Sequence, residues 1–195
     1  MAQHKLKILP PKSGLDWLII GKHPNGPKQL AELNHLDAYN SIGLNEAAAL
    51  FRTRYAITGH GSVLDRLHAN GVQAEQIIGV LSPFDPLQIW QGSTPRIGDF
   101  IRHDWQPEFS QEQMDAMVQA ARENRDINYG QWWSVLHLAV FYALKKGAQG
   151  ITIIGCDHTP GTLPGMVKGA EEHFDMLRRH TEMLVKSCGA VWVRG

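Results

Sequence analysis

Short apolar runs alternate with segments of helical spacing along most of this chain. The runs are rich in Ile, Leu and Val and bounded by Gly, Pro or Asn, which is typical of buried strands. Predicted strands cover residues 15–20, 39–44, 54–59, 75–81, 150–155 and 190–193. Between them, apolar residues recur every three or four positions, as in Leu30, Leu33 and Leu36, which indicates amphipathic helices. Predicted helices cover residues 28–36, 45–52, 62–70, 110–125, 131–147 and 169–189.

This alternation predicts an α/β fold of the Rossmann-like kind, with a mostly parallel sheet and helices on both faces. Right-handed crossovers place the carboxyl ends of all parallel strands at one edge of the sheet. Ligands of open α/β sheets bind in the crevice at that edge. Residues that directly follow the strands are therefore the first candidates for a functional site.

The regular pattern is interrupted once, over residues 82–109. This stretch carries four prolines and no sustained periodicity, so we expect an irregular insertion with one short strand at 98–103. Irregular segments of this length in a compact domain are usually functional or mobile. The whole chain, 1–195, is otherwise predicted to be a single domain.

Composition excludes several classes of function. Lys+Arg and Asp+Glu both number 19, so the net charge of +0 argues against a nucleic-acid binder that relies on bulk charge. No apolar stretch approaches the ~20 residues of a membrane span, and the first residues do not resemble a signal peptide. Cys156 and Cys188 form neither a disulfide framework nor a zinc set. We therefore expect reduced thiols in a cytoplasmic protein. The sequence leaves open whether the chain forms a homo-oligomer.

Two candidate positions follow the first two strands. The loop GKHPNG contains Gly21, Asn25 and Gly26 and leads into a helix, where backbone N–H groups suit a phosphate. It matches no established phosphate-loop pattern, and a plain turn would also need Gly and Pro. Asn45 ends the second strand at the predicted N-cap of a helix, so its amide either caps that helix or holds a nucleotide base or ribose.

Two further strands end in chemically active side chains. His60 follows the third strand, where it would serve as a donor, base or ligand, or simply as a cap. Asp157 and His158 follow the strand at 150–155, and a carboxylate leaving a buried strand needs a partner. That partner is a ribose hydroxyl, a metal or a local backbone turn.

The helix at 169–189 carries His173 and His180, seven residues apart and thus on one face. The chain contains no HExxH motif, no paired cysteines and no carboxylate cluster. We therefore predict no metal site from the motifs.

The order of these motifs resembles a known pattern. A strand with its loop (IIGKHPNG) is followed by SIGLN, YAITGH and then NYGQWWSVLHLAVFYALKKGAQGITIIGCD. This order is similar to the Rossmann-like core of the bacterial lipooligosaccharide sialyltransferases. It also resembles that of the archaeal 6-hydroxymethylpterin pyrophosphokinase-like proteins. The similarity covers residues 15–81 and 128–193.

The resemblance to the sialyltransferases implies a site that binds a cytidine nucleotide donor. The matching donor-binding positions are Gly21, Asn25, Gly26, Asn45 and the loop from Asn128 to Gly130. The family's general base corresponds to His173, followed here by Asp175. The first loop departs from the family's Gly-Asn-Gly-Pro-Ser, and the family's phosphate-binding tyrosines are absent after Asp157.

Three hypotheses about function follow. The first is a small nucleotide-dependent transferase of the glycosyltransferase kind, with His173 and Asp157 as catalytic candidates. Its nucleotide-binding candidates are Gly21, Asn25, Gly26, Asn45, His60, Asn128, Gly130 and His158. The second is a pyrophosphokinase-like enzyme that needs Mg²⁺, with Asp157 as its leading ligand. The third is a nucleotide- or sugar-binding module without catalysis.

Overall fold

The computed structural model describes residues 15–33, 36–58, 61–69, 74–79, 88–89, 109–127, 134–157 and 170–194. Within this part of the chain, seven strands form one sheet. They are β1 (Asp16–Ile20), β2 (Asn40–Leu44), β3 (Tyr55–Thr58), β4 (Gln76–Gly79), β5 (Gln88–Ile89), β6 (Gly150–Ile154) and β7 (Val191–Trp192). The helices are α1 (Gly26–Ala31), α2 (Ala47–Leu50), α3 (Gly61–Ala69), α4 (Gln111–Arg122), α5 (Val135–Lys145) and α6 (Ala170–Cys188), with a 3₁₀ turn at Leu36–Ala38.

The strand order is β5-β4-β3-β2-β1-β6-β7, and all neighbours are parallel except β4 and β5. The chain builds outward from β1 to β4 and then returns to the other side of β1 with β6. The order therefore reverses between β1 and β6, as at the ligand-binding switch point of a Rossmann-like sheet. The predicted fold class is confirmed.

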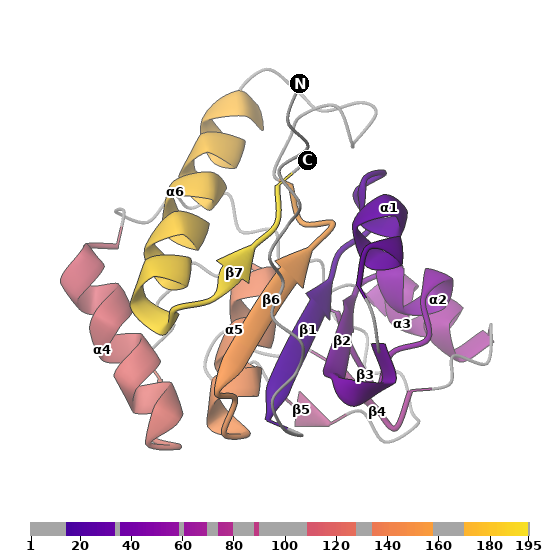
Figure 1. Cartoon of the computed structure of the whole chain (residues 1–195), viewed down its shortest axis with the longest axis horizontal. Helices are drawn as coiled ribbons and strands as arrows, with labels where there is room; N and C mark the ends of the chain where they lie inside the picture. The colour runs from indigo at the N-terminus through magenta and orange to yellow at the C-terminus, as the bar shows by residue number, and fades with distance from the viewer. Residues whose placement is uncertain are drawn as a thin grey trace.

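Alternate residues of β1 enter different parts of the core. Trp17 and Ile19 belong to an apolar cluster that also contains residues of α4, α5 and α6. Leu18 and Ile20 belong to a second cluster, together with Leu33, which follows α1 in the chain. Figure 1 shows α4 and α6 side by side, with α1, α2 and α3 grouped toward the other end of the sheet. Because a strand's side chains alternate between faces, helices cover both faces of this sheet.

The most apolar predicted helix is also the most buried. All side chains of α5 from Leu136 to Leu144 are buried, and the helix lies behind the sheet in Figure 1. Ser134 caps its first turn by accepting a hydrogen bond from the backbone N–H of His137 at 3.3 Å. The predicted capping box of α4 is also present, between Ser110 and Gln113.

Several predicted boundaries differ from the structure. The helix predicted over 28–36 is the shorter α1 followed by the separate 3₁₀ turn, and the helix predicted over 45–52 is only the four residues of α2. Within the insertion, β5 adds an antiparallel strand that the sequence pattern does not indicate, because two residues show no periodicity. The strand predicted at 98–103 lies outside the described residues. Among the described helices, none is long and apolar enough to cross a membrane.

Candidate functional site

The loops after β1 and β6 touch through their backbones at the switch point. The N–H of Gly21 donates to the carbonyl of Ile154 at 2.9 Å, and that of His23 donates to the carbonyl of Gly155 at 3.0 Å. A Cβ atom at Gly21 would lie 2.1 Å from the Gly155 carbonyl oxygen. Gly155 itself has a φ of +61°, which glycine adopts without strain. Close approach of two loops therefore accounts for both glycines.

The same contacts decide what the predicted phosphate loop offers to a ligand. The N–H of Gly26 donates to the carbonyl of His23 at 2.8 Å, and that of Asn25 donates to Nδ1 of His23 at 3.3 Å. Asn25 precedes α1 without a side-chain cap, and Pro27 has no N–H to give. An anion bound here needs side-chain donors, because these backbone donors already have acceptors.

A buried glutamine, which sequence reasoning missed, ties α1 to the loop after β6. The Gly155 N–H donates to Oε1 of Gln29 at 2.8 Å, and Nε2 of Gln29 donates to the carbonyl of Val193 at 3.4 Å. Gln29 is only 5% exposed. A single polar residue on a short predicted helix gives no sequence signal for this role.

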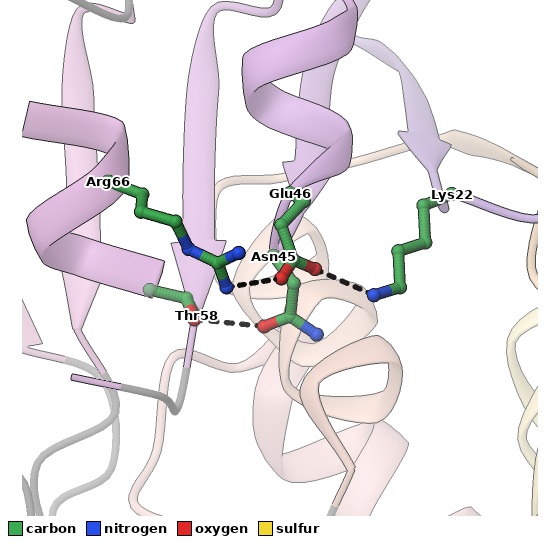
Figure 2. Close-up of polar contacts among 5 residues, drawn as sticks. All are labelled: Lys22, Asn45, Glu46, Thr58 and Arg66. Atoms are coloured by element: carbon green, nitrogen blue, oxygen red, sulfur yellow. Dashed lines mark hydrogen bonds and ion pairs between the residues drawn. The ribbon is translucent and has the colours of Figure 1, made fainter. Parts of the chain in front are cut away.

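Asn45 lies at the end of β2 as predicted, but it does not cap a helix. The N-cap of α2 is Glu46, and Asn45 has a φ of 50° in the left-handed region, which Asn tolerates better than most residues. Its N–H donates to the carbonyl of Ile57 at 2.9 Å, and its Oδ1 accepts a hydrogen bond from the Thr58 hydroxyl at 2.9 Å. The amide nitrogen points away from Thr58 (Figure 2). The cap interpretation is therefore wrong, and Asn45 joins the ends of β2 and β3.

Beside Asn45, one carboxylate holds two cations. Glu46 accepts from Nζ of Lys22 at 2.8 Å and from Nη2 of Arg66 at 2.6 Å. Figure 2 shows the three side chains converging with Asn45 and Thr58 at the strand ends. Burial by itself raises the pKa of Glu46, but the hydrogen bond and charge of Lys22 and the charge of Arg66 outweigh burial and lower that pKa. The Glu46 carboxylate is therefore ionised at neutral pH. Together with Lys22 and Arg66 it forms a cluster with one excess positive charge.

Sequence reasoning did not single out these three residues. Lys22 and Glu46 lie two residues after the ends of β1 and β2, but only their neighbours in these loops, such as Gly21 and Asn45, were named as candidates. Arg66 lies within α3, where nothing in the pattern indicates that it reaches the ends of other strands.

Asp157 has a partner that the sequence did not indicate. Its Oδ2 lies 3.4 Å from Nδ1 of His23, and the two side chains are only 9% and 14% exposed. The pair joins the loops after β6 and β1 at the switch point. His158, proposed as a neighbour in this site, lies outside the described residues.

The predicted histidine face of α6 is only partly described. His180 is 1% exposed, and its Nε2 accepts a hydrogen bond from the N–H of Phe109 at 3.3 Å. Asp175 is exposed and pairs with Arg178. The side chain of His173, and the whole of His60, Asn128 and Gly130, lie outside the described residues.

Two general findings complete the site. In the part of the chain that the structure describes, no three His, Cys, Asp or Glu side chains gather closely enough to hold a metal ion. No protein-family model matches the chain, and no curated protein or solved structure is significantly similar to it.

Proposed function

We propose that this protein is a small transferase that uses a nucleotide-linked donor, as the glycosyltransferases do, and binds that donor along the carboxyl edge of its sheet. The observation that carries the proposal is the pairing of Lys22 and Arg66 on Glu46 at this edge. Two fixed cations against one carboxylate favour an anion, and charge-assisted bonds from Lys or Arg to phosphate are the strong ones.

The surroundings of the cations support a nucleotide rather than a bare anion. Asn45 adjoins Glu46, with its oxygen engaged by Thr58 and its amide nitrogen directed away from that contact. An amide in such a position can hydrogen-bond a ribose or a base. The switch point between β1 and β6 lies next along the same edge, where open α/β sheets bind mononucleotides and dinucleotides.

The proposed reaction transfers the donor group from a phosphate to an acceptor hydroxyl. The bond between the donor carbon and the phosphate oxygen breaks, and the nucleotide phosphate leaves with the electron pair. Lys22 and Arg66 would stabilise the charge that develops on that phosphate, which is the usual work of cations in such sites.

Thermal unfolding with a panel of nucleotides tests the proposal. CMP, CDP, UMP, UDP, ATP, CMP-N-acetylneuraminate and UDP-glucose are each added with and without Mg²⁺. A ligand of the native state raises the melting temperature. We expect a pyrimidine nucleotide to stabilise the wild-type protein without metal. If only ATP stabilises the protein, and only when Mg²⁺ is present, the pyrophosphokinase-like alternative is favoured. If no nucleotide raises the melting temperature, a nucleotide site is contradicted.

Two variants test the residues that carry the proposal. Lys22→Ala and Arg66→Ala each remove a charged donor, so each is expected to weaken nucleotide binding about tenfold or more. Arg54→Ala is the matched control, because Arg54 also forms an exposed ion pair, with Glu75, but precedes β3 at the other edge of the sheet. Equal losses in all three variants would mean that general charge, not this site, attracts the nucleotide.

A further inference from the structure

The carboxylate of Glu46 lies between the two cations that would hold the phosphate of the donor. Its Oε2 is 2.8 Å from Nζ of Lys22, and its Oε1 is 2.6 Å from Nη2 of Arg66. The three residues come from separate elements, because Lys22 follows β1, Glu46 follows β2 and Arg66 belongs to α3, which follows β3. Figure 2 shows the Glu46 carboxylate between the ends of the other two side chains. An anion of the protein itself therefore already bridges segments that follow three neighbouring strands.

A phosphate has the geometry to take the place of this carboxylate. Both groups present oxygens on one central atom, and guanidinium groups bind both through paired N–H donors. The side chains of Lys22 and Arg66 are 45% and 58% exposed, so a ligand reaches them from solvent. Ion pairs between exposed side chains contribute little to folding stability, so the fold tolerates the opening of these two pairs. The exchange of one anion for another therefore depends mainly on their charges.

We propose that Glu46 competes with the phosphate of the donor for Lys22 and Arg66, so that this site selects phosphates that carry two negative charges. The inference rests on the proposed transferase function. A phosphodiester carries one negative charge, as the Glu46 carboxylate does, and gains little by replacing it. A phosphomonoester is close to a dianion at neutral pH, because its second pKa is about 6. At equal distance, its attraction to the two cations is nearly twice that of the carboxylate.

This competition favours the departing phosphate over the bound donor. In the transfer, the donor carbon bonds to the acceptor oxygen, and its bond to the phosphate oxygen breaks. The electron pair stays on the phosphate, which gains one negative charge, and the acceptor proton passes to water. Lys22 and Arg66 then leave Glu46 for the more highly charged phosphate. Interactions that strengthen as the reaction proceeds lower its barrier, whereas equal binding of the donor and the departing phosphate does not.

Calorimetric titration with CMP and UMP, and with the methyl ester of each phosphate, tests the selection by charge. The methyl ester keeps the base, the ribose and the phosphorus but has one negative charge less. We expect the wild-type protein to bind at least one of the two monophosphates about tenfold more tightly than its methyl ester. Equal affinities for a bound monophosphate and its ester would overturn the selection of dianions.

Glu46→Gln removes the competing charge and keeps the size of the side chain. We expect this variant to bind the methyl ester about tenfold more tightly than the wild-type protein does, and to melt within a few degrees of it. Glu75→Gln is the matched control, because it changes the net charge equally at an exposed carboxylate that pairs with Arg54 at the other edge of the sheet. Equal gains in both variants would show an effect of general charge, and weaker binding in Glu46→Gln would show that the carboxylate positions the cations. Either result overturns the competition.

The same replacement in the Arg66→Ala background separates competition from simple repulsion. With Arg66 truncated, Glu46 occupies only Lys22, so Glu46→Gln should raise the affinity less than it does in the wild-type protein. Repulsion between Glu46 and the ligand would instead give the same gain in both backgrounds, and that result would overturn the competition. All of these outcomes leave the transferase function standing. If neither the wild-type protein nor Glu46→Gln binds any nucleotide of the panel, the transferase function itself is overturned.

Discussion

At the scale of single residues, Gly21 is where the fold and the candidate site depend on each other most directly. A Cβ there would meet the Gly155 carbonyl oxygen at 2.1 Å and the Cys156 sulfur at 2.7 Å. The first contact cannot be relieved by rotating a side chain, because the oxygen belongs to the backbone. The two loops that carry His23 and Asp157 can lie together only because residue 21 has no side chain.

Gly21→Ala is therefore expected to lower the free energy of unfolding by about 3 kcal/mol, at the upper end of overpacking effects. Gly147→Ala is the control: its φ of +83° strains an L-residue, but nothing lies within 4 Å of the new Cβ. That variant should lose only about 1 kcal/mol. Urea unfolding of both variants measures the difference. Similar losses would show that the loops separate easily.

The residues also show why a strand-end pattern predicts position better than role. Asn45 and Asp157 lie at strand ends as the sequence predicts, since strand ends follow from apolar runs. Their partners, Thr58 and His23, come from other strands, and a single sequence does not say which strands are neighbours. The cap interpretation of Asn45 was wrong for this reason: its backbone and side chain both bond to the β3 segment.

At the scale of elements, one buried polar network joins α5 to α6. Nδ1 of His137 lies 3.0 Å from the Ser134 hydroxyl, and Nε2 lies 2.9 Å from the Thr181 hydroxyl. Thr181 is fully buried and also donates to the carbonyl of Leu177 at 2.8 Å. Thr181 therefore accepts from Nε2 of His137, and Nδ1 of His137 accepts from the Ser134 hydroxyl. These hydrogen bonds link α5 to α6.

Thr181→Val keeps the shape of the side chain but leaves the Nε2–H of His137 without this acceptor. The cost of an unsatisfied buried donor predicts a loss of about 2 kcal/mol in unfolding free energy. Thr53→Val is the matched control, because Thr53 is 3% exposed and its hydroxyl has no hydrogen-bond partner among the described residues. That variant should be neutral or slightly stabilising. Chemical denaturation checks both, and equal effects would contradict the network.

Helix and strand positions could largely be predicted, because the periods of the apolar pattern reflect burial directly. α5 is an example: its nearly continuous apolar sequence matches burial from Leu136 to Leu144. The ends of α1 and α2 were predicted less well, since they depend on Pro27 and on the left-handed backbone of Asn45. The antiparallel pairing of β5 depends on contacts with β4 that no local pattern encodes.

At the scale of the whole molecule, Cys156 lies where the two halves of the sheet meet. It follows β6 at the switch point, is 9% exposed, and adjoins the loop after β1. Burial, and secondarily the charge of Asp157, raises the pKa of its thiol far above the ordinary range. Because the thiolate is the reactive form, Cys156 should react only when the β1 and β6 loops separate.

Thiol labelling can therefore report how cooperatively the sheet opens. In Cys188→Ser, which leaves Cys156 alone, we expect labelling by a disulfide reagent at pH 8 to accelerate with urea as steeply as global unfolding does. In Cys156→Ser, the remaining Cys188 is only half-buried at the end of α6, so local fraying should label it faster and with little dependence on urea. Burial also raises the pKa of the Cys188 thiol, which slows its reaction with the reagent, but the side chain is still partly exposed. Fast, urea-independent labelling of Cys156 would mean instead that the switch point opens on its own while the rest of the sheet stays folded.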